Sequence, residues 1–275
     1  MIKKVLQSNF KILANKKIGR DYFKLTFVSP EISAAACPGQ FVEVRVPDCD
    51  GLLLRRPIGV HSVSSKSCNI LVEIVGPATR ALSHKAAGEY LDIIGPLGNG
   101  FSFQLSAIPA AGGSAFGGSF QPIIVAGGMG VAPLYFLAER IKQQKPLVLI
   151  GARTKSQILC EKEFKKLGCS VKIVTDDGSC GSRGRVTDLL KKILSENSGL
   201  KAQSYIYACG PKPMLKAVSR ISQDHGIPAQ ISLEEHMSCG IGACLGCVVK
   251  TTTGFQRVCK EGPVFNSREI IWEGL

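Results

Sequence analysis

Four cysteines near the carboxyl end of the chain have the spacing of ligands for an iron–sulfur cluster. They are Cys239, Cys244, Cys247 and Cys259, which form the pattern C-x4-C-x2-C-x11-C. The first three match the spacing of plant-type [2Fe–2S] ligands, with the fourth thiolate arriving from further along the chain. The alternative is a structural zinc site, which usually arranges its ligands as two C-x2-4-C pairs at wider separation. The spacing favours an iron–sulfur cluster, which would accept and donate single electrons.

The residues between these cysteines suit a loop that bends around a cluster. Gly240, Gly242 and Gly246 permit tight bends and leave backbone N–H groups free to point at the sulfurs. Such hydrogen bonds help to set the reduction potential of the cluster. The other seven of the eleven cysteines (11 − 4) are scattered singly, and we expect them to be small buried apolar residues, Cys209 excepted.

A second candidate site is a glycine-rich turn that follows a buried-strand run and opens a helix. It contains Gly127, Gly128, Gly130 and Pro133, and it reads G-x-G-x-x-P from Gly128. Glycines at a strand–helix junction let a pyrophosphate approach backbone N–H groups at the positive end of the helix. A turn of this kind is often only a turn, so two further strand ends are needed to support a nucleotide site.

The two further strand ends carry Cys209-Gly210-Pro211 and Asp176-Asp177. In a sheet of order 3-2-1-4-5 the first and fourth strands are neighbours, so the glycine turn and Cys209-Gly210-Pro211 would flank one crevice. A carboxylate such as Asp176 accepts hydrogen bonds from ribose hydroxyls and repels a 2′-phosphate, which favours NAD, whereas Arg153 would accept that phosphate. Either aspartate is equally compatible with an ordinary turn. We expect NAD, with Cys209 either beside the nicotinamide or a buried structural thiol.

Two kinds of element must position these residues. Up to residue 105 apolar and polar residues alternate, as in Phe23, Leu25 and Phe27, which predicts a closed antiparallel barrel or a sandwich. From residue 122 strand and helix alternate, which predicts a doubly wound parallel α/β sheet. The expected strands are Ile123–Ala126, Leu147–Ile150, Val171–Thr175, Tyr205–Ala208 and Ile231–Leu233, and the expected helices are Gln157–Leu167, Thr187–Glu196 and Met214–His225. We expect the last forty residues to be organised by something other than apolar burial.

The composition limits the classes of function. The 275 residues carry 34 basic and 21 acidic side chains, a net charge of +13, but the basic run near the N-terminus has no interleaved aromatic residues, so nucleic-acid binding is not expected. Residues 93–138 hold no charge, yet Pro96, Pro109, Pro122 and Pro133 interrupt them, so we expect no membrane span. Eleven cysteines without an export signal favour the reducing cytoplasm. The four histidines show no ligand spacing, and no catalytic side chain is expected.

Several motifs occur together and in order along the whole chain. They are Arg55-Arg56-Pro57-Ile58, Gly95–Phe101, Gly127–Pro133, Thr175–Ser179, Cys209-Gly210-Pro211 and Glu234–Phe265 with its four cysteines. In these motifs the chain resembles the electron-transfer subunits of NAD-dependent (class 1B) dihydroorotate dehydrogenases, within the ferredoxin–NADP reductase-like superfamily. The resemblance implies an FAD-binding β-barrel (1–105), a flexible linker (106–121), an NAD-binding α/β domain (122–230) and a [2Fe–2S] lobe (231–275).

The same resemblance implies a partner and a pathway. Electrons would pass between NAD, FAD, the [2Fe–2S] cluster and an FMN in a separate catalytic subunit that oxidises dihydroorotate to orotate, in de novo pyrimidine (UMP) biosynthesis. The expected assembly is a heterotetramer of two plus two subunits. Nicotinamide exchanges two electrons and a cluster exchanges one, so the flavin, which does both, belongs between them.

By the same resemblance, three segments contact the flavin and its phosphates. They are Arg56, Pro57, Ile58 and Gly59, then Leu71, Val72 and Glu73, then Ala78 and Thr79. Three positions depart from the family pattern: Gly59 replaces a serine, Glu73 stands where arginine is common, and Gly76-Pro77-Ala78-Thr79 replaces a G-x-G-T turn. We therefore expect a changed hydrogen bond near the flavin and a carboxylate that is a poor phosphate neighbour.

Two other interpretations stay open. The same cofactors would suit a subunit of a ferredoxin- or sulfide-linked NAD(P)H oxidoreductase, or the reductase of an oxygenase. A zinc-stabilised binding module without redox activity is the third hypothesis. The intact fourth cysteine and the segment Gly262-Pro263-Val264-Phe265 favour the dihydroorotate-linked subunit.

Overall fold

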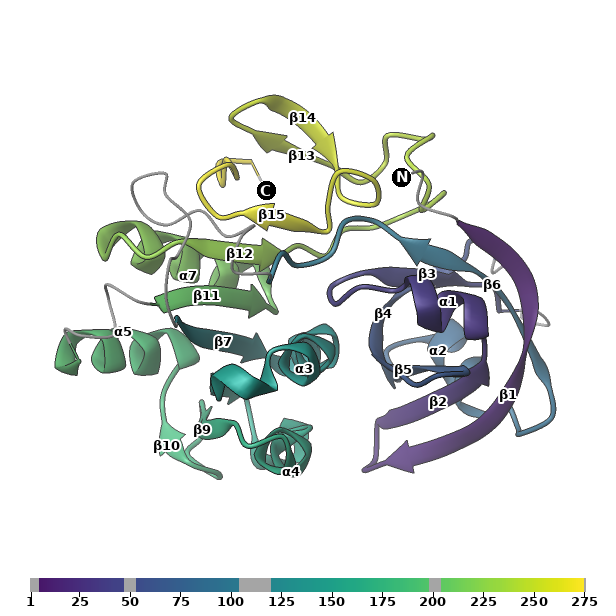
Figure 1. Ribbon diagram of the computed structural model, residues 1–275, viewed down its shortest axis with the longest axis horizontal. Helices are drawn as coiled ribbons and strands as arrows, with labels where there is room; N and C mark the ends of the chain where they lie inside the picture. The colour runs from purple at the N-terminus through teal and green to yellow at the C-terminus, as the bar shows by residue number, and fades with distance from the viewer. Residues whose placement is uncertain (1–4, 47–52, 104–119, 198–203, 275) are drawn as a thin grey trace.

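The amino-terminal part of the chain closes into an antiparallel barrel (Figure 1). The computed structural model describes residues 5–46, 53–103, 120–197 and 204–274. The barrel order is β1-β2-β5-β4-β3-β6, which confirms the barrel alternative over the sandwich. Its strands are β1 (Leu6–Ile18), β2 (Tyr22–Val28), β3 (Phe41–Val44), β4 (Arg56–Val63), β5 (Ser67–Glu73) and β6 (Tyr90–Leu97), with the short helices α1 (Pro30–Ala35) and α2 (Pro77–Ser83).

The alternating pattern of β2 has the predicted cause. Phe23, Leu25 and Phe27 point into the barrel and are at most 2 % exposed. Strand β3 differs, because Glu43 is fully buried along with its apolar neighbours Val42 and Val44. The outer face of β3 is covered by the carboxyl-terminal part of the chain, so alternation of polar and apolar residues does not indicate a solvent-exposed face there.

The second layer is a seven-stranded sheet of order β10-β9-β8-β7-β11-β12-β15. Its five central strands run in the predicted order 3-2-1-4-5 and are parallel. The strands are β7 (Gln121–Gly127), β8 (Leu147–Ala152), β9 (Ser170–Thr175), β10 (Ser182–Arg183), β11 (Ser204–Cys209), β12 (Ala229–Ser232) and β15 (Val264–Asn266). The connecting helices are α3 (Val131–Arg140), α4 (Glu161–Lys166), α5 (Val186–Glu196) and α7 (Lys212–Asp224), with the 3-10 turns η2 (Gly128–Gly130), η3 (Lys142–Gln144) and η4 (Lys155–Gln157).

The helices cover the two faces of this sheet because their apolar stripes belong to two different cores. Leu134 and Leu137 of α3 and Phe164 of α4 pack into one core, while Leu190 of α5 and Leu215 of α7 pack into the other. Helix α3 also contacts β4 of the barrel, so it is shared between the two layers. Helix α3, which follows the glycine turn, is therefore packed between the sheet and the barrel.

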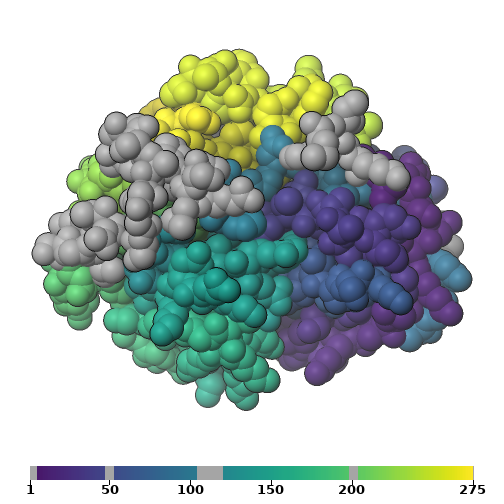
Figure 2. Space-filling model, in the orientation of Figure 1, coloured from purple at the N-terminus to yellow at the C-terminus, as the bar shows by residue number. Residues whose placement is uncertain are grey.

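The carboxyl-terminal segment is anchored by apolar burial, so our expectation that something else organises it was wrong. Val249, Val258, Phe265 and Ile270 are buried in the same core as α5 and α7. The segment contains the hairpin β13 (Val248–Thr251) and β14 (Gly254–Arg257), and its strand β15 pairs antiparallel with β12. Strands of three or four residues are too short to show a period in the sequence. In Figure 2 this segment, in yellow, lies across both the barrel and the sheet.

The predicted linker lies mostly outside the described residues. Within it, Phe120 is buried and Gln121 begins β7, so these two residues belong to the sheet layer. The uncharged stretch 93–138 contains the end of β6, all of β7 and most of α3. In the described part of the chain no helix is long and apolar enough to cross a membrane.

Candidate cofactor sites in the cleft, on the barrel and in the cysteine loop

A cleft of about 720 Å³ opens where the carboxyl ends of the central strands face the barrel. Its lining includes the three predicted strand ends, namely Gly127, Gly128 and Gly130 after β7, Gly210 and Pro211 after β11, and Asp176 after β9. The structure therefore brings together the residues that the sequence predicted to flank one crevice. The barrel supplies the facing wall, including Tyr22 and Glu73.

Close packing at the bottom of the cleft explains why the turn is built from glycine. A Cβ at Gly130 would overlap the carbonyl group of Cys209, and a Cβ at Gly127 would lie 2.6 Å from the sulfur of Met214. Gly128 has φ +53°, a conformation that favours glycine, and open space around it. No side chain caps the start of α3, but the Val131 N–H donates to the carbonyl oxygen of Gly128 and Pro133 has no N–H. The positive end of the helix dipole therefore favours an anion in the cleft, without a full set of free N–H groups.

The two aspartates after β9 have different roles. Asp177 accepts hydrogen bonds from the backbone N–H (2.9 Å) and the hydroxyl (2.6 Å) of Ser179, and these bonds hold the pKa of Asp177 below its usual value. Its carboxylate is therefore used within the turn. Asp176 is exposed and lines the cleft. Arg153, which would favour the 2′-phosphate of NADP, also lines it.

Cys209 is placed beneath the cleft rather than in its lining. Its side chain is 1 % exposed, and burial raises the pKa of its thiol well above the usual value. The structure thus agrees with the interpretation of Cys209 as a buried thiol. Pro133, the last residue of the predicted turn motif, lies within α3 and faces Gly59 of the barrel, 3.7 Å from the position of a Cβ there.

The cleft residues that the sequence reasoning missed include Tyr22, Gln157, Arg185 and Glu234. A helix that follows the third strand must start at the carboxyl edge of the sheet, so the position of Arg185 just before α5 was a usable signal. Tyr22 enters through barrel pairing with Glu73, 51 residues away, and no local pattern shows this. Burial and then the Glu73 carboxylate raise the pKa of Glu234.

The predicted flavin segments lie on three neighbouring barrel elements. Arg56 to Gly59 belong to β4, Leu71 to Glu73 end β5, and Ala78 and Thr79 form the first turn of α2. Leu71, Val72 and Ala78 are buried, so only their backbone groups are available to a ligand. Ile58 points into the barrel core as well.

The barrel residues fit an FAD. The backbone is open at Gly76, where nothing lies within 4 Å of a Cβ position, and at Gly59, whose nearest neighbour is Pro133. Thr79 accepts hydrogen bonds from the N–H groups of Val75 (2.9 Å) and Gly76 (3.2 Å), which shapes the turn without the usual glycine. At the departure Glu73, the Tyr22 hydroxyl donates to the carboxylate at 3.2 Å, and both groups line the cleft.

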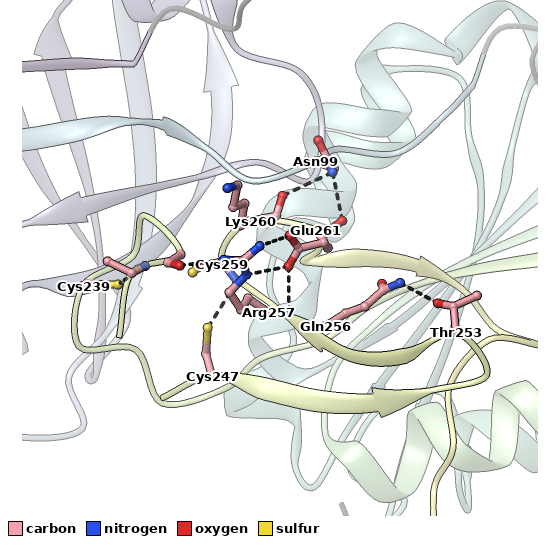
Figure 3. Close-up of polar contacts among 11 residues, drawn as sticks. Asn99, Cys239, Cys247, Thr253, Gln256, Arg257, Cys259, Lys260 and Glu261 are labelled. Carbon is pink, nitrogen blue, oxygen red and sulfur yellow. Dashed lines mark hydrogen bonds and ion pairs between the residues drawn. The ribbon is translucent and has the colours of Figure 1, made fainter. Parts of the chain in front are cut away.

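In the cysteine loop, backbone N–H groups point at the sulfurs. The N–H groups of Ala243 (3.3 Å) and Cys244 (3.4 Å) donate to Sγ of Cys239, and that of Gly246 (3.4 Å) donates to Sγ of Cys244. Cys247 Sγ accepts from the N–H of Cys259 at 3.4 Å (Figure 3). This is the amide pattern expected from the interleaved glycines, and it suits thiolate ligands.

The amide pattern has an electrostatic effect on Cys239. Burial raises the pKa of Cys239, but the N–H groups of Cys244, Ile241 and Ala243 together outweigh it and bring the pKa to about 6. Cys239 is therefore largely a thiolate at neutral pH, the form that binds iron. Within the described ranges no three His, Cys, Asp or Glu side chains are arranged to hold a metal ion, so the assignment rests on spacing, amide pattern and family.

The barrel, the 3-2-1-4-5 sheet and the cleft between them define the class of NAD-binding flavoprotein reductases. The family model described as "Oxidoreductase NAD-binding domain" matches residues 124–220, and that described as "Iron-sulfur cluster binding domain of dihydroorotate dehydrogenase B" matches residues 234–271. The chain belongs to the family of electron-transfer subunits of dihydroorotate dehydrogenase B (NAD(+)).

Relatives of nearly equal length support this assignment. The electron-transfer subunit of dihydroorotate dehydrogenase B from Desulforamulus reducens is 38% identical over 271 residues, with 96% of this chain and 97% of that protein covered. The Enterococcus faecalis subunit is 37% identical over 274 residues, with 96% and 98% covered.

Two solved structures show the same fold. A chain of the NADH-dependent reduced ferredoxin-NADP oxidoreductase, solved in work on flavin-based electron bifurcation, has a TM-score of 0.81 and 30% identity, with 97% of this chain and 91% of that chain covered. A ferredoxin NADP+ reductase from Neisseria gonorrhoeae has a TM-score of 0.62 and 18% identity, with 80% and 92% covered, and shows the fold alone.

Proposed function

We propose that the chain carries electrons between NAD and the FMN of a separate catalytic subunit that oxidises dihydroorotate, in pyrimidine biosynthesis. The observation that supports this proposal most strongly is that one surface of the barrel contacts both the nucleotide cleft and the cysteine loop. Gly59 of β4 faces Pro133 of the nucleotide-binding turn, while Glu43 of the adjacent β3 packs against Gly240 of the cysteine loop. An FAD held on this surface would lie between the cleft and the cluster loop, which supports the proposed order of electron transfer. When bound, it supplies the exchange between two-electron and one-electron transfer.

In this proposal, the residues of the chain bind the three cofactors and orient them for electron transfer. The open backbone at Gly128 and the positive end of α3 hold the pyrophosphate of NAD, and Asp176 accepts hydrogen bonds from the adenosine ribose. Arg56 and the open backbone at Gly76 hold the FAD phosphates. Cys239, Cys244, Cys247 and Cys259 hold the [2Fe–2S] cluster, with backbone N–H groups directed at three of the four sulfurs.

The cysteine loop also supplies the surface on which the catalytic subunit docks. Ile241 and Leu245, which lie between the cluster ligands, are 54% and 60% exposed. Exposed apolar side chains beside a redox centre suit a protein partner that must approach closely. We expect two copies of each subunit in the complex, working in the reducing cytoplasm, where the cysteines outside the cluster loop stay as thiols.

The experiment is co-expression with a candidate FMN-containing dihydroorotate dehydrogenase, followed by anaerobic purification of the complex. We expect flavin and iron–sulfur absorbance in the purified complex, both bleached by NADH and by dihydroorotate. The double variant Ile241→Asp, Leu245→Asp keeps bleaching by NADH and loses bleaching by dihydroorotate. A complex that forms and is bleached by NADH alone would overturn the assignment of the electron partner.

The resemblance to the ferredoxin-linked oxidoreductase chain favours one second candidate. In that case the same subunit reduces a ferredoxin-type protein, and NADH-dependent reduction of added ferredoxin is faster than reduction of the dihydroorotate-oxidising subunit. The match of residues 234–271 to the dihydroorotate dehydrogenase B cluster domain favours the first function.

A further inference from the structure

Arg257 joins the two stretches of chain that hold the four cysteines. It ends β14, two residues before Cys259, and its Nη1 donates to the carbonyl oxygen of Gly242 at 2.8 Å. Gly242 lies in the loop between Cys239 and Cys244. The guanidinium therefore ties the loop of the first three ligands to the strand that leads to the fourth (Figure 3).

The other side of the same guanidinium is held by Glu261. Nε donates to one carboxylate oxygen at 2.9 Å, Nη2 donates to the other, and the backbone N–H of Arg257 donates to the first oxygen at 2.8 Å. The side chains are 26% and 31% exposed, so the pair is only partly shielded from water. A two-pronged pair of this kind fixes orientation as well as charge, which a lysine does not do.

The segment that carries Glu261 is also hydrogen-bonded to the amino-terminal barrel. The Asn99 side chain, which follows β6, donates to the carbonyl oxygens of Lys260 (3.2 Å) and Glu261 (2.9 Å). The charged pair is therefore anchored on the barrel side and on the cysteine-loop side. Figure 3 shows that these contacts link Asn99, through Glu261, to the guanidinium of Arg257.

From this geometry we infer that Arg257 is a positioning residue that closes the cluster loop and whose fixed positive charge, opposed by Glu261, sets the reduction potential of the cluster. The inference rests on the proposed function. Reduction adds one electron to the cluster, so a nearby positive charge favours the reduced form and a nearby negative charge disfavours it. The guanidinium lies against Gly242, which is midway between Cys239 and Cys244 in the chain, and Arg257 itself is two residues from Cys259.

The test is an anaerobic redox titration of the cluster, followed by electron paramagnetic resonance, on the complex with its catalytic subunit. Arg257→Gln removes the positive charge and leaves Glu261, so the potential falls. Glu261→Gln leaves the positive charge unopposed and keeps the Gly242 bond, so the potential rises. In the double variant Arg257→Gln, Glu261→Gln the reduction potential returns toward the parent value. Arg257→Lys keeps the charge and loses the two-pronged contact, so its potential stays near the parent value while the cluster is lost several-fold faster in air.

The matched control is the pair Arg220 and Asp224 on α7, which has the same four-residue spacing and is largely exposed. Arg220→Gln and Asp224→Asn leave the potential unchanged. Shifts in the same direction for Arg257→Gln and Glu261→Gln, or no shift with the cluster fully retained, would overturn the inference. Failure of the proposed function looks different, because NADH then bleaches the parent complex and dihydroorotate does not.

Discussion

The imidazole of His61 on β4 stacks on the phenol ring of Tyr135 on α3, with ring centroids 4.8 Å apart and planes 23° from parallel. This contact joins the barrel to the sheet layer beside the face shared by Gly59 and Pro133. Nδ1 of His61 lies 3.1 Å from the carbonyl oxygen of Ala132 in the same helix. A buried titratable ring at this junction makes the attachment of the two layers sensitive to acid.

The first prediction concerns that sensitivity. Burial lowers the pKa of His61 from 6.5 to about 4, so the unfolded chain binds the proton first and stability falls as the pH drops from 6.5 to 4. The loss amounts to about 3 kcal/mol. His61→Asn has lower stability at pH 7 and a flatter decline on acidification. Denaturant unfolding of both proteins at pH 7 and 4.5 measures the difference, and equal declines would contradict the assignment.

The second prediction separates the two aspartates after β9. Asp176→Asn weakens NADH binding by about 10- to 100-fold, which is the cost of losing a hydrogen bond to a charged group. It also reduces the ratio by which the protein prefers NADH to NADPH. Asp177→Asn is the control, because that carboxylate is occupied by Ser179 within the turn. Steady-state KM values for NADH and NADPH measure both. Equal effects of the two substitutions would place the ribose elsewhere.

The third prediction concerns Gly130. Because the carbonyl group of Cys209 occupies the space of a Cβ, Gly130→Ala forces the backbone apart and costs about 1–3 kcal/mol of unfolding free energy. Gly59→Ala is the matched control, since its Cβ meets Pro133 at an ordinary 3.7 Å. Denaturant titrations of the two variants give the comparison, and a Gly130→Ala protein as stable as the control would refute the packing argument.

The fourth prediction uses the space at Gly59. Gly59→Ser places a hydroxyl beside the bound flavin and slows FAD release by about two- to ten-fold, the value of one hydrogen bond. Gly59→Ala adds the Cβ without the hydroxyl and serves as the control. The fluorescence of released FAD reports the rate. If serine and alanine behave alike, the flavin does not lie against this residue.

Much of the architecture followed from local signals. The alternation in β2 predicted a barrel or a sandwich, and the strand–helix succession after residue 122 predicted a parallel sheet, because period alone signals these classes. Closure of the barrel depends on long-range pairing of β1 with β6. The glycine turn predicted which residues gather in the cleft, and the cysteine spacing predicted the kind of domain that residues 234–271 match. These motifs work because their chemistry is set by backbone geometry within a few residues.

Other features depend on contacts across the chain and had no local signal. Glu43 reads as an outward polar residue of a strand, yet the cysteine loop covers it, with Gly240 directly against its carboxylate. Tyr22 reaches the cleft only through its pairing with Glu73 in the barrel. Strand β15 was missed because three residues show no period, and its partner β12 precedes it by more than thirty residues.

Strand β15 also orders events during synthesis. The sheet acquires its seventh strand only when Val264–Asn266 pair with β12, and every cysteine of the cluster loop precedes Val264 in the chain. A growing polypeptide therefore cannot complete its nucleotide-binding sheet before the ribosome has made the entire ligand set. A message truncated within the loop would yield a chain with an unpaired β12 edge, which cellular proteases can recognise, rather than a stable reductase lacking its iron.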